Sequence, residues 1–101
     1  MQKGNASILF EKPPAVGCWG CIAGKKEAEG PLGGGLDRTE TDDRLGQETW
    51  EAAESELQRR TARLTLEKAG LKAADIRYLF AGDLLGQLTA TSLGARELGI
   101  P

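Results

Sequence analysis

The clearest pattern in the sequence is a set of apolar positions spaced three to four residues apart between residues 47 and 69. This spacing predicts one long amphipathic helix. The positions are Trp50, Ala53, Leu57, Thr61 and Leu64, widened by Leu66 and Ala69. Gly70 follows them, and glycine readily adopts the left-handed conformation that ends many helices. We therefore expect the helix to end at this glycine.

A run of apolar residues comes next, followed by another helical stretch. Residues 76–81 read Ile-Arg-Tyr-Leu-Phe-Ala, and consecutive apolar residues are typical of a parallel strand that is covered on both faces. Residues 90–98 predict a second helix, with Thr89 as its N-cap and with Gly94 allowing a close approach to a strand. Helix, strand and helix are thus expected over residues 47–101.

The first 46 residues carry weaker patterns. Residues 7–10 and 15–22 are candidate strands, and two prolines separate them; proline lacks the amide that a strand ladder needs. Residues 29–37 are rich in glycine and proline and predict a loop, while the polar residues 38–44 predict a surface connection. We expect strands and a glycine-rich loop over residues 1–46.

Strands that alternate with helices predict an α/β fold with a mostly parallel sheet. The last predicted helix has no strand to lead into, and a single good strand would leave both helices poorly covered. We therefore expect residues 1–101 to be the incomplete N-terminal part of a larger α/β domain. On this interpretation, a further strand would follow Pro101.

Composition restricts the possible functions. The length of 101 residues allows one domain at most. A formal net charge of −2 argues against a nucleic-acid partner, because such surfaces are normally basic. The sequence contains no histidine, which removes histidine-activated nucleophiles and histidine metal ligands. We expect no catalytic residue, no metal site and no cofactor in this chain.

No targeting or membrane-spanning segment is expected. The N-terminus leads only into residues 7–10, which are too short for the apolar region of a signal peptide. Residues 15–24 are the longest weakly apolar stretch, well below the roughly 20 residues that cross a bilayer.

Charged residues are unevenly placed along the long helix. Glutamates fill its first half and arginines and a lysine its second half, an order that complements the helix dipole. Glu56 and Arg60 form a favourable pair one turn apart. The charged run, made of Glu51, Glu54, Glu56, Arg59, Arg60 and Arg63, is expected to be the solvated face of the helix.

Two motifs resemble known sites only in composition. Cys18 and Cys21 match the C-x-x-C spacing, but they precede any predicted helix, and a zinc site would need two more ligands. In a strand they would point to opposite faces, so we expect two small apolar fillers. Residues 30–35 are glycine-rich but lack the Lys-Ser/Thr ending of a phosphate-binding loop, and a flexible surface loop is expected there.

Asp83, Gln87 and Thr89 are the candidate ligand-binding residues. They follow the predicted strand of residues 76–81, and ligands of open α/β sheets bind beyond the carboxyl ends of the strands. The start of the next helix could also receive an anion. The alternative is that Asp83 caps the loop or pairs across a dimer contact.

Several blocks of the sequence together resemble the stage V sporulation protein AD family. They are Glu29-Gly30-Pro31-Leu32-Gly33, Trp50-Glu51-x-Ala53-Glu54, Leu66-Glu67-Lys68-Ala69-Gly70-Leu71, Ala81-Gly82-Asp83-Leu84-Leu85-x-Gln87 and Ala95-Arg96-x-Leu98-x-Ile100-Pro101. The third and fifth blocks are shared more widely with β-ketoacyl-acyl-carrier-protein synthase III. The three glycines at 33–35 and the two cysteines depart from the family pattern.

The resemblance implies a thiolase-like fold of layered α/β/α structure, here incomplete and with a mostly parallel sheet, and a homodimer at full length. It implies a protein that binds dipicolinic acid and supports its transport into the developing spore. The implied partners are other stage V sporulation membrane proteins, and the implied location is peripheral, on the cytoplasmic side of the spore inner membrane. The alternative is a condensing enzyme of fatty-acid or polyketide synthesis. In such relatives the reactive cysteine lies beyond the point that matches Pro101, so no catalytic role passes to Cys18 or Cys21.

Overall fold

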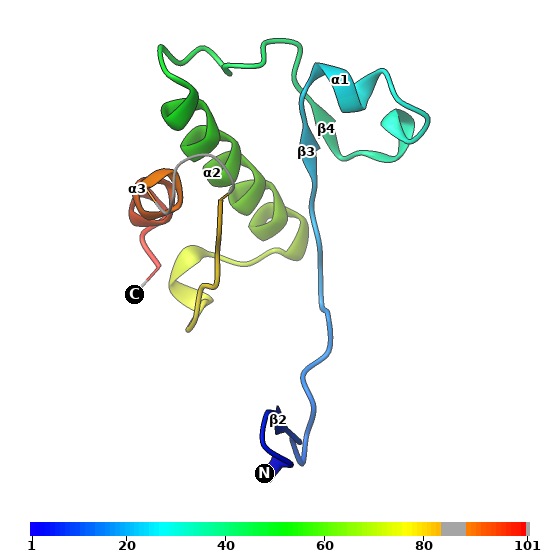
Figure 1. Cartoon of the computed structure of the whole chain (residues 1–101), viewed down its shortest axis with the longest axis vertical. Coiled ribbons are helices and arrows are strands. Elements are labelled where there is room, and N and C mark those ends of the chain that lie inside the picture. Colours follow the sequence, from blue (N-terminus) through cyan, green and yellow to red (C-terminus); the bar gives the residue numbers. More distant parts are fainter. Residues whose placement is uncertain (84–88, 101) are drawn as a thin grey trace.

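The computed structural model describes residues 1–83 and 89–100 and shows a mixed α/β protein (Figure 1). Its strands are all two residues long and its main helices lie in the second half of the chain. The elements are β1 (Gln2–Lys3), β2 (Ser7–Ile8), β3 (Ile22–Ala23), the short helix α1 (Lys25–Ala28), the 3-10 turn η1 (Gly33–Gly35), β4 (Arg38–Thr39), α2 (Trp50–Ala69), the 3-10 turn η2 (Ala73–Asp75) and α3 (Thr89–Glu97).

Helix α2 is the element that the sequence predicts best. It begins after Thr49, whose hydroxyl accepts a hydrogen bond from the amide of Ala52 at 3.1 Å. It ends at Gly70, which has a φ of 70°, and the amide of Leu71 donates to the carbonyl of Leu66 at 3.0 Å. The predicted glycine stop is therefore confirmed, and the start lies three residues later than predicted because Thr49 supplies the cap.

The chain turns sharply just before α2. The carboxylate of Asp42 accepts hydrogen bonds from the amides of Arg44, at 3.0 Å, and Gly46, at 2.7 Å. Leu45 between them has a φ of 51°, an uncommon conformation for a residue with a side chain. Its side chain is only 7% exposed. The turn thus directs the leucine side chain inward, where burial helps to offset the backbone strain.

The two sheets are much smaller than predicted. β1 and β2 pair antiparallel, and β3 and β4 pair parallel with Ile22 opposite Arg38. Of the expected strand at residues 15–22, only Ile22 pairs with another strand. Its partner, β4, comes from residues 38–44, where a surface connection was expected. A mostly parallel sheet is therefore not observed among the described residues.

The predicted strand at residues 76–81 is wrong as a strand. This segment runs extended (Figure 1), but it pairs with no strand in the described parts of the chain. Phe80 is 91% exposed and Tyr78 is 71% exposed, so the segment is not covered on both faces. A parallel strand needs a neighbour that is distant in sequence, and none of the described segments supplies one.

The best-packed part of the molecule is the contact between α2 and α3 (Figure 1). Ala53 of α2 and Ala90 of α3 are buried in it. A side chain at Gly94 would place its Cβ 3.0 Å from the carbonyl oxygen of Ser55, so glycine permits the helices to approach closely. Gly94 was expected to face a strand, and it faces a helix instead.

Candidate functional site

The predicted site residue Asp83 holds the beginning of α3. Its Oδ2 atom accepts hydrogen bonds from the backbone amide of Thr91, at 2.9 Å, and from the hydroxyl of Thr91, at 2.6 Å. Thr91 is the third residue of α3, and its amide has no partner within the helix. Asp83 therefore acts as a capping side chain for α3, whereas the alternative from the sequence was a cap of the loop or a contact across a dimer.

Side chains of helix α2 support this arrangement. The side-chain amide of Gln58 donates to the Thr91 hydroxyl oxygen at 3.1 Å and to the Gly82 carbonyl at 3.3 Å. The hydroxyl of Ser55 donates to the carbonyl of Ala90 at 2.6 Å. The α2 side chains thus bind both the first turn of α3, at Ala90 and Thr91, and the segment that carries Asp83.

The other two predicted site residues have different outcomes. Gln87 lies outside the described residues. Thr89 is the first residue of α3 and is exposed, so the helix starts one residue earlier than predicted and Thr89 does not precede it as an N-cap. The structure brings Asp83 and the start of α3 together, as expected from their places in the sequence.

A cavity of about 400 Å³ lies beside Asp83. Its walls combine one aromatic ring, apolar side chains, an amide and two carboxyl groups, contributed by Trp50, Ala53, Glu54, Leu57, Gln58, Gly82 and Asp83. Carboxylates repel an anion and attract a cation. This cavity therefore favours a cation or hydrogen-bond donors, and a dianion would need a cation between it and the wall.

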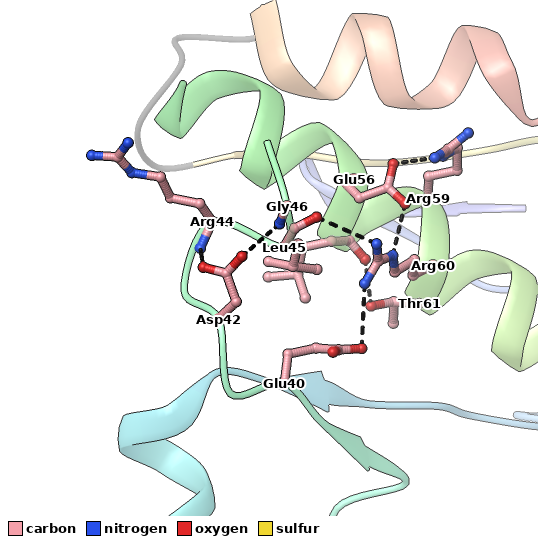
Figure 2. Close-up of polar contacts among 10 residues, drawn as sticks. Glu40, Asp42, Arg44, Leu45, Gly46, Glu56, Arg59, Arg60 and Thr61 are labelled. Atoms are coloured by element: carbon pink, nitrogen blue, oxygen red, sulfur yellow. Dashed lines mark hydrogen bonds and ion pairs between the residues drawn. The ribbon is translucent and has the colours of Figure 1, made fainter. Parts of the chain in front are cut away.

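A second polar cluster links α2 to its surroundings, and Figure 2 shows most of it. The carboxylate of Glu56 pairs with Arg59, one turn later, and with Arg60 at 2.7 Å. Arg59 also pairs with Glu97 of α3 at 2.9 Å, and Arg60 pairs with Glu40, next to β4, at 3.4 Å. We call these five residues the Glu56 network.

The Glu56 network corrects the prediction of a solvated charged face. Glu56 is buried, and its side chain is only 11% exposed, while the side chains of Arg59 and Arg60 are 26% and 33% exposed. The pairing of Glu56 with Arg60 is confirmed. The spacing within α2 could identify Arg59 and Arg60 as partners of Glu56. It carried no information about Glu40 and Glu97, which belong to other segments.

The charge state of Glu56 follows from two opposed effects. Burial raises the pKa of its carboxyl group, but the hydrogen bonds from Arg60 and Arg59 more than offset this, so the pKa lies below its usual value. The hydrogen bond with Glu56 raises the pKa of Arg60 in turn. Glu56 is therefore ionised at neutral pH, and the network is a fixed set of charges that joins α2, α3 and the segment at β4.

The two cysteines lie in different surroundings, as the alternation of an extended chain predicts. The Cys18 thiol lies 3.9 Å from the carbonyl oxygen of Thr65 on α2, whereas the Cys21 thiol lies 3.6 Å from Oδ2 of Asp37. Asp37 also accepts from Lys68 at 2.8 Å, and this bond lowers the pKa of the aspartate. Both thiols are free and half-buried.

Groups that could hold a metal ion were sought in the described parts of the chain. Residues 1–83 and 89–100 contain no cluster of three or more cysteine, aspartate or glutamate side chains with suitable placement. In the same residues, none of the helices combines the length and the apolar character that a bilayer crossing requires.

Comparison with known proteins identifies the family. The profile of stage V sporulation protein AD matches residues 4–101. Stage V sporulation protein AD of Bacillus subtilis (strain 168) is 40% identical over 98 residues, which cover 97% of this chain and 29% of that protein. The chain thus spans less than a third of the length of this relative, and it belongs to the stage V sporulation protein AD family.

Proposed function

We propose that this chain acts in spore formation as part of a protein that binds dipicolinic acid and supports its transport into the developing spore. The observation that carries the proposal is the family match, which runs through residues 4–101. We further propose, on the same basis, thiolase-like layering and a homodimer at full length. Other stage V sporulation membrane proteins are the proposed partners, at the cytoplasmic side of the spore inner membrane.

Dipicolinate is a small aromatic dianion, and this restricts how it could meet the proposed residues Asp83, Gln87 and Thr89. Asp83 and Glu54 both line the cavity formed by α2 and residues 82–83 and would repel a dianion. A bridging cation such as Ca²⁺ would remove the repulsion. We therefore propose that the main anion-binding groups belong to the part of a full-length family protein that this chain does not span.

A chimera tests the proposal in cells. Residues 4–101 would replace the matching segment of the Bacillus subtilis relative, in a strain that lacks its own copy. We expect the chimera to restore the dipicolinic acid content of the spores. The proposal would be contradicted if the strain formed spores with normal levels of the chimera and these spores lacked dipicolinic acid.

Calorimetry on the purified chimera tests binding directly. Dipicolinate would be titrated with and without Ca²⁺. We expect saturable binding, strengthened by Ca²⁺ if the cavity beside Asp83 contributes. In the Asp83→Asn variant, Ca²⁺ should no longer strengthen binding, while the affinity for dipicolinate without Ca²⁺ should be unchanged. A chimera that binds no dipicolinate under either condition would refute a binding role.

A further inference from the structure

No further inference is drawn: the strongest candidate, the cavity of about 450 Å³ that Cys18 lines together with α2, Leu71 and Ile76, rests on a single thiol and an apolar wall, and nothing in the described part of the chain shows what occupies it.

Discussion

Replacing Glu56 by glutamine tests how much of the stability of this chain depends on its buried charges. The substitution keeps the size of the side chain but removes the charge that pairs with Arg59 and Arg60. Loss of one partner from a fully buried ion pair costs about 3–5 kcal/mol, because the other charge stays buried and unpaired. Here the loss should be smaller, since both arginines keep a second carboxylate and remain about one-quarter to one-third exposed.

We therefore expect Glu56→Gln to lower the free energy of unfolding by about 2–3 kcal/mol. The assay is urea denaturation of the 101-residue chain at neutral pH, followed by the far-ultraviolet circular dichroism of the helices. With a slope of about 1.5 kcal/mol per M urea, the midpoint should fall by roughly 1.3–2 M. Glu67→Gln is the matched control, because Glu67 is exposed on the same helix, and it should change stability by less than about 0.5 kcal/mol.

The same network gives a pH dependence with a definite sign. The pKa of Glu56 is lower in the folded protein than its ordinary value of 4.5. Its contribution to stability is therefore fully present above that ordinary value and is lost as the pH falls through the lower, folded pKa. Acid should thus destabilise the native chain more than the Glu56→Gln variant. Equal urea midpoints for Glu56→Gln and Glu67→Gln, or parallel acid curves for the native chain and Glu56→Gln, would refute this account.

Three further substitutions test individual contacts. Gly20→Ala should destabilise the chain by about 1–3 kcal/mol, because the added Cβ would lie 2.4 Å from Oγ1 of Thr65; Gly17→Ala, with open space around it, is the control in thermal denaturation. Gly94→Ala should separate α2 from α3, and faster hydrogen exchange at Ala90 in the variant than in the native chain would show it. Asp83→Ala should cost about 1 kcal/mol by removing the acceptor for Thr91, and an unchanged urea midpoint would contradict the capping role.

The sequence predicts local structure well in this protein because the determinants of α2 are local. The apolar spacing, the Thr49 cap and the Gly70 stop all lie within the helix or next to it. The sequence indicated Asp83 as a possible cap of its loop, and the partner that it has in the structure, Thr91, is only eight residues away. The partners of Arg59 and Arg60 on other segments, Glu97 and Glu40, were not indicated, because helix periodicity does not say which segments pack together.

The strand predicted at residues 76–81 is not formed for the same reason, which is that the sequence does not say which segments pack together. Apolar side chains favour burial whatever covers them, but a strand also needs backbone partners, which for parallel pairing are distant in sequence. In this chain Phe80 stays 91% exposed, so the apolar run alone does not make a strand. The run is therefore better understood as a requirement for a neighbour than as a description of the segment.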